Sequence, residues 1–179
     1  MLKKTTELGT FYGVRVYAHP SVIPASVGLA VVSALIAGAL GAGIILAILG
    51  AVVAVLLHWV NAMVHQIGHS TAARLTGYPM HHATMYMILE TSVYPRDEPE
   101  LPAAVHRRRA LGGPLANLLW ALVWMIPSLV LFFGVGAAAW PLYFMVLESV
   151  FVFCLAAFVP LHMIGLETDG STLLKHWRG

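Results

Sequence analysis

The most constraining feature of this sequence is the absence of charge from two long apolar stretches. No Asp, Glu, Lys or Arg occurs between Arg15 and Arg74, and Glu148 is the only charged residue from Ala110 to Leu166. The chain is 59% hydrophobic and 10% charged, whereas a soluble domain is about 25% charged. This pattern indicates an integral membrane protein. It excludes an ordinary soluble globule, a disordered chain and a nucleic-acid-binding protein.

The apolar stretches are long enough for four membrane-spanning helices. A spanning helix needs about 20 apolar residues, and runs of this kind cover roughly 21–38, 43–64, 115–135 and 140–161. We expect the second helix to continue beyond its apolar run, over 43–69. Glycine-containing turns at 38–43 and 134–139 join the members of each pair, because glycine tolerates the positive φ of tight turns. We therefore predict an all-α membrane protein that forms one domain over 1–179.

The basic residues predict the orientation in the membrane. All ten Lys and Arg lie before the first predicted span, between the second and third, or after the fourth. The positive-inside rule assigns these segments to the cytoplasm. We expect an integral protein of the plasma membrane of a prokaryote, with both termini in the cytoplasm. The segment 106–109 would serve as a topological anchor.

Two segments on the cytoplasmic side are rich in β-branched and aromatic residues. They cover 11–17 and 84–94, and Pro20, Pro79 and Pro95 lie near their ends. We predict that they are strands of a small sheet beside the membrane. The charged, proline-containing segment 96–102 is predicted to be a solvated loop.

Two histidines stand at the inner end of the second span. His65 and His69 are four residues apart, so on a helix they share one face and can bind one zinc ion together. The chain has nine His, so this spacing also arises by chance. A pair of histidines hydrogen-bonded within the helix bundle is the alternative.

The predicted topology brings two further polar residues to the same depth. The fourth span ends on the same membrane face as the second, so Asp169 can supply the third ligand that a catalytic zinc site needs. A turn or helix cap is the other interpretation of Asp169. Asn117 follows Gly112-Gly113-Pro114 at the predicted start of the third span. It would hold a substrate backbone or cap the helix.

Three motifs together resemble the site-2 protease family, peptidase family M50, whose members are intramembrane zinc metalloproteases. The motifs are His65-Gln66-Ile67-Gly68-His69, Gly113-Pro114-Leu115-Ala116-Asn117 and Thr168-Asp169-Gly170. The resemblance implies a three-helix core, Zn²⁺ bound by His65, His69 and Asp169, and a sheet at 11–17 and 84–94 that holds substrate as an added strand. It also implies the lipid bilayer and a single-span membrane protein substrate as partners.

The sequence departs from the family at Gln66. The family has a Glu there, which deprotonates the zinc-bound water and later protonates the leaving amine. Gln can hydrogen-bond the water but cannot take its proton, and a general base contributes typically 10²–10⁴-fold. We expect a protease that is inactive or strongly impaired. The alternative is a non-catalytic zinc-binding pseudoprotease that binds membrane protein partners.

Two carboxylates are candidates to replace the missing base, and a histidine lies near it in the sequence. Glu167 is the preferred substitute, because a two-residue offset in an extended segment points it the same way as Asp169. Glu148 lies nearer the outer side, so we expect it to be paired within the bundle. His58 shares a helix face with His65, as a partner of the site or as a structural histidine.

A third function class is a membrane haem or ion-transport protein with histidine ligands. Haem usually takes axial ligands from different helices, whereas His65 and His69 lie on one, which argues against that class.

Overall fold

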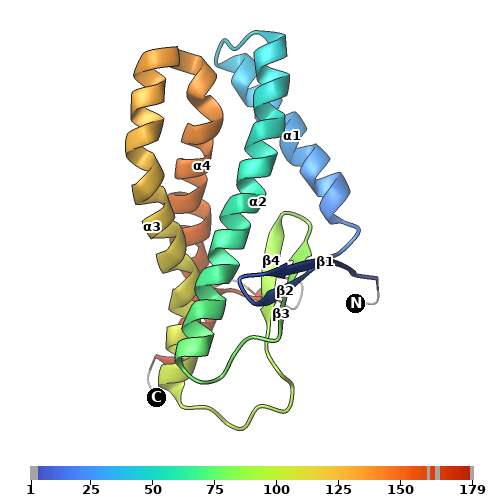
Figure 1. The fold of residues 1–179 in the computed structure, drawn as a ribbon, viewed down its shortest axis with the longest axis vertical. Coiled ribbons are helices and arrows are strands. Elements are labelled where there is room, and N and C mark those ends of the chain that lie inside the picture. Colours follow the sequence, from blue (N-terminus) through green and yellow to red (C-terminus); the bar gives the residue numbers. More distant parts are fainter. Residues whose placement is uncertain (1–3, 161, 164–165, 178–179) are drawn as a thin grey trace.

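The computed structural model is a bundle of long helices with a small sheet against its side (Figure 1). The structure describes residues 4–160, 162–163 and 166–177. Its long helices are α1 (Val22–Ala39), α2 (Ile44–Leu75), α3 (Ala103–Val135) and α4 (Trp140–Val150). Within these residues, four helices are long and apolar enough to cross a membrane, α4 being counted with its continuation to Phe158. The predicted membrane fold, with four spanning helices and a small sheet, is confirmed.

Helices α2 and α3 are longer than the bilayer is thick. They have 32 and 33 residues, which corresponds to about 50 Å each, against about 30 Å of hydrocarbon. The prediction that the third helix starts at residue 115 is therefore wrong, since α3 begins twelve residues earlier at Ala103. The apolar pattern marks only the part that can lie in lipid, and a charged helical extension precedes it. Pro114, expected to open the helix, lies inside it.

The fourth span departs from a regular α-helix before its predicted end. After α4 the chain forms a wider π-helical turn at Phe151–Leu155 and a 3-10 turn at Ala156–Phe158. Val159 is already extended, so the helical part ends before the predicted residue 161, which lies outside the described residues. The extended segment lets the chain reverse towards the short strands β5 (His162–Met163) and β6 (Leu166–Glu167) and helix α5 (Asp169–His176).

The sheet beside the helices has four strands in the order β1-β2-β3-β4. They are β1 (Thr6–Phe11), β2 (Val14–Ala18), β3 (His82–Tyr86) and β4 (Leu89–Val93). β1 and β2 pair antiparallel, as do β3 and β4, whereas β2 and β3 pair parallel. The predicted strands at 11–17 and 84–94 thus each contain a hairpin turn. At these turns φ is 47° at Tyr12, 77° at Gly13 and 55° at Met87, as tight hairpins require.

One face of the sheet packs on helix α2. Val14, Val16, Ala83 and Met85 form a buried cluster against α2 residues that include Trp59 and Met63. In the β3–β4 register Met85 stands opposite Glu90, and Ala83 stands opposite Ser92. Paired residues in a sheet project to the same side, so this face also carries Glu90 and Ser92. Strand β4 is the edge strand next to α2 (Figure 1).

Helices α2 and α3 approach each other closely where the histidines lie. A Cβ added to Gly68 would collide with the carbonyl oxygen of Gly112, and one added to Gly112 would collide with that of Gly68. Small residues permit this close contact between membrane helices. The crossing therefore brings α3 directly behind His65 and His69.

Candidate metal centre

Three ligand atoms converge from two elements that are distant in the sequence. His65 and His69 lie on α2, and Asp169 is the first residue of α5. The Nε2 atom of His65 is 3.2 Å from Asp169 Oδ2, and that of His69 is 3.4 Å from Oδ1. Bonds of about 2.0–2.1 Å in a tetrahedron place neighbouring zinc ligands about 3.3 Å apart. The two distances between histidine and carboxylate are close to that spacing, and the three ligand atoms all lie within 4.8 Å of one another.

The other nitrogen of each imidazole is held by a fixed acceptor. Asn117 Nδ2 donates to the carbonyl oxygen of Asn61 at 3.2 Å, so its Oδ1 faces His65 Nδ1 at 3.0 Å and accepts from it. His69 Nδ1 donates to the Arg109 carbonyl oxygen at 2.7 Å. In these tautomers both Nε2 lone pairs point towards Asp169. Hydrogen bonds of this kind orient histidines that bind metals.

The chemistry and the space at this point fit a cation. Two Nε2 lone pairs and a carboxylate are all acceptors, and a metal ion satisfies them together. Burial opposes ionisation of Asp169, but His69 and His65 more than offset it and hold the pKa of that carboxyl at about 2. On the α3 side, a Cβ at Gly113 would collide with Nε2 of both histidines. The glycine therefore keeps the ligand atoms accessible to an ion.

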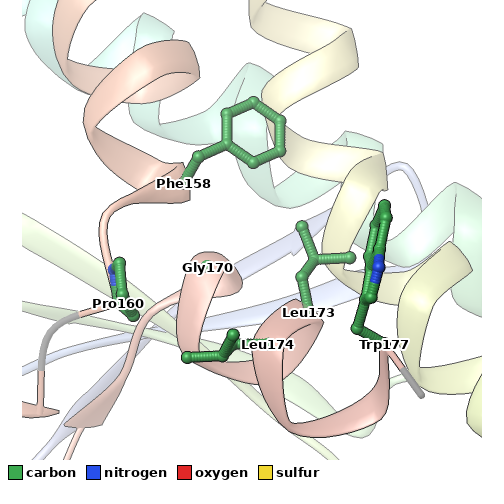
Figure 2. A pocket seen from close by; sticks show the side chains of 6 residues that line it. All are labelled: Phe158, Pro160, Gly170, Leu173, Leu174 and Trp177. Carbon is green, nitrogen blue, oxygen red and sulfur yellow. The ribbon is translucent and has the colours of Figure 1, made fainter. Parts of the chain in front are cut away.

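Asp169 is positioned by the junction between the fourth span and α5. Thr168 caps α5 by accepting from Ser171 N, and its hydroxyl donates to the Val159 carbonyl oxygen at 2.8 Å. Gly170 packs so tightly on Phe158 that a Cβ would strike the Phe158 carbonyl. Figure 2 shows Gly170 at the start of α5 near Phe158, with Leu173 of α5 close by. The first turn of α5 is thus fixed to the end of the fourth span, opposite the histidines.

Gln66 is held against the sheet. It lies between the two histidines in the sequence and is buried. Its Oε1 accepts a hydrogen bond of 2.8 Å from Ser92 Oγ on β4. Ser92 was not predicted from the sequence, because its contact with Gln66 depends on which face of β4 packs against α2. The alternation of Glu90 and Ser92 within a strand was the one available signal.

Two other sequence candidates have contacts that do not favour their expected roles. Asn117 is fully buried, and its amide is used by His65 and Asn61, so its role as a substrate-binding residue stays a prediction. Glu167 is exposed at the end of β6, and Asp169 begins a helix instead of continuing a strand. The extended segment assumed for these two residues therefore ends at Thr168, and Glu167 as a substitute base stays a prediction.

Glu148 is paired inside the bundle, as expected. His58 Nδ1 and Glu148 Oε1 are 2.6 Å apart, and Asn61 Nδ2 donates to Glu148 Oε2 at 3.0 Å. Asn61 also accepts from Ser149 at 2.7 Å. Since the Asn61 carbonyl binds Asn117, this buried network connects to the ligand His65.

Arg109, which belongs to the predicted topological anchor at 106–109, is buried. Its guanidinium donates to both carboxylate oxygens of Glu98, at 2.5 and 3.0 Å, and to the Tyr78 carbonyl at 2.6 Å. It also lies 4.1 Å from the centroid of the Tyr94 ring, where burial raises the pKa of the phenol to about 12. The loop at 96–102 is thereby tied to the residue whose carbonyl holds His69.

Comparison with known proteins bears on the fold. No protein-family model and no curated protein matches this chain. Among solved structures, the site-2 protease from Methanocaldococcus jannaschii matches with a TM-score of 0.64 and 16% sequence identity. The match covers 98% of this chain and 72% of that one. The chain therefore has a site-2-protease-like fold, as the sequence motifs predicted.

Proposed function

We propose that this protein is a zinc-dependent intramembrane protease of the site-2 type, with Zn²⁺ bound by His65, His69 and Asp169. The observation that carries the proposal is the convergence of their three ligand atoms on this fold, each imidazole being held from behind by a fixed oxygen. Bound zinc polarises a carbonyl group and lowers the pKa of water. Asn117 and the Arg109 carbonyl would hold the two histidine ligands in place.

The position of the edge strand β4 favours a membrane protein as the substrate. β4 pairs with β3 on one side only among the described strands, and its Ser92 contacts Gln66 beside the ligands. An extended substrate segment added along β4 would make main-chain hydrogen bonds. A single-span membrane protein that is locally unwound supplies such a segment.

Gln66 would limit the rate of peptide-bond hydrolysis. Its amide is placed beside His65 and held by Ser92, but an amide cannot take a proton from water. A missing general base lowers the rate by about 10²–10⁴-fold. The chain is therefore a slow protease as it stands.

The test combines metal analysis with the change Gln66→Glu. We expect about one zinc per chain in both forms, and cleavage of a single-span substrate about 10²–10⁴-fold faster in Gln66→Glu. The control is His69→Ala in the Gln66→Glu background, which should lose zinc and activity together. Absence of zinc from the purified protein would contradict the metal centre.

A second outcome distinguishes the alternative function. The identity of Gln66 itself favours a non-catalytic protein that binds membrane partners. If both forms bind zinc and neither cleaves a single-span substrate, while that substrate is retained on the protein, the binding function replaces the proposed protease.

A further inference from the structure

An open apolar hollow lies between α5 and the end of the fourth span. Its volume is about 340 Å³, and the residues that line it are Phe158, Pro160, Gly170, Leu173, Leu174 and Trp177 (Figure 2). None of these side chains is charged, and the indole N–H of Trp177 is their one polar group. Leu174 and Trp177 are 69% and 70% exposed. Exposed apolar surface of this kind marks a site of interaction with a protein or a membrane.

The lining residues of α5 form one face of that helix. Gly170, Leu173, Leu174 and Trp177 follow the i, i+3, i+4, i+7 spacing of an apolar helical stripe. Trp177 is the C-cap residue and still has helical backbone angles. Lys175 is exposed and lies about 200° around the helix from Trp177. α5 is therefore amphipathic, with its apolar face at the hollow and Lys175 on the other side.

The length of the fourth span places the hollow at the edge of the hydrocarbon layer. The span runs from Trp140 to Phe158 and has 19 residues, which corresponds to about 28 Å of helix, against about 30 Å of hydrocarbon. Phe158 therefore lies where lipid tails meet headgroups. A Cβ on Gly170 would collide with the Phe158 carbonyl, so α5 begins at the same depth.

From that depth α5 runs along the charged extension of α3. The ring of His176 stacks on that of His106 with 4.0 Å between their centroids, and Arg107 donates to the His176 carbonyl at 2.8 Å. Both α3 residues precede the apolar part of that helix. The end of α5 that carries Trp177 thus lies at the level of the headgroups, where tryptophan is enriched and amphipathic helices bind.

We propose that α5 is an interfacial helix, whose apolar face lies in the lipid leaflet at this end of the bundle, with phospholipid acyl chains in the hollow. Continuity with the fourth span favours lipid as the occupant, because acyl chains surround the span as far as Phe158. The inference goes beyond the proposed protease function and does not depend on it. Its consequence for the site is that lipid holds in place the helix that begins with Asp169.

The first test measures quenching of Trp177 by brominated phospholipids. The protein is reconstituted in phosphatidylcholine bilayers brominated either close to the headgroup or near the chain ends. The chain has five Trp, so the fluorescence of Trp177 is taken as the difference between the unmodified chain and Trp177→Phe. We expect bromine close to the headgroup to remove more than about half of this signal, and bromine near the chain ends to remove less.

The matched control moves the indole to the other side of α5. Lys175→Trp in the Trp177→Phe background should emit as a water-exposed indole and be quenched only weakly. Equal quenching at the two positions, or none at Trp177, would overturn the proposal. Protection of Trp177 that requires an added single-span substrate, or a high ratio of protein to lipid, would also overturn it, since the hollow would then hold substrate or a second copy.

A second measurement compares two adjacent positions without using tryptophan. Nitroxide labels are attached to Leu174→Cys and to Lys175→Cys in a chain whose Cys154 is replaced by Ser. We expect the label at 174 to collide more often with oxygen, which concentrates in lipid, and the label at 175 with a water-soluble nickel chelate. The same preference at both positions would contradict an interfacial helix. Neither measurement uses zinc or cleavage, so failure of the protease function leaves this test intact.

Discussion

Asn117 shows how much of the metal centre depends on a single side chain. Its amide is fixed by the Asn61 carbonyl, and its Oδ1 holds His65 in the tautomer that leaves Nε2 free. Removing a partner of this kind typically lowers metal affinity 10–100-fold. We therefore expect Asn117→Leu to weaken zinc binding by that factor, measured by competition with a chelator.

The matched variant for this prediction is Asn117→Asp. It keeps an oxygen that can accept from His65 and should retain most of the zinc affinity. Equal affinities in Asn117→Leu and the unmodified chain would show that the hydrogen bond does not orient the ligand.

Some residues of the site can be found from local sequence patterns, and others cannot. Spacing along one helix was enough to propose His65 and His69, and topology added Asp169. Ser92 could not be found in that way. Its contact with Gln66 depends on which face of β4 meets α2, and that follows from hairpin registers that no local pattern specifies.

At the scale of secondary-structure elements, the spacing of α2 and α3 controls the metal centre. Gly113→Ala should reduce zinc occupancy sharply, because the added Cβ would collide with Nε2 of both histidines. Gly134→Ala is the matched change in the same helix, where a Cβ meets open space. Elemental analysis of both variants checks the prediction. Full zinc occupancy in Gly113→Ala would mean that the two helices separate readily.

The elements themselves were only partly predictable. The spanning segments followed from hydropathy, but the first turns of α3 include His106 and three Arg and carry no long apolar run. The two hairpins were hidden inside continuous β-rich segments. The turn at Met87 has φ of 55° without a glycine, so the usual signal of a tight turn is missing there.

At the scale of the whole molecule, the orientation in the membrane stays a prediction with a direct test. The α1–α2 and α3–α4 connections lie at the same end of the bundle, away from the C-terminal end (Figure 1). In a chain whose Cys154 is replaced by Ser, we expect Leu40→Cys and Ala138→Cys to react with an impermeant reagent added outside the cell. Glu100→Cys should react only after the cells are opened. Labelling of Glu100→Cys from outside would reverse the orientation.

One stripe of α3 stands behind both histidines. The Arg109 carbonyl, Gly113 and Asn117 follow one another at intervals of four residues, so a single helix face carries the support of both histidine ligands. Long helices adapt to a thin bilayer by tilting. A tilt of α3 against α2 would shift all three supports at once. We therefore expect zinc affinity to depend on the thickness of the surrounding bilayer. The same protein should bind the ion with different affinity in short-chain and long-chain lipids.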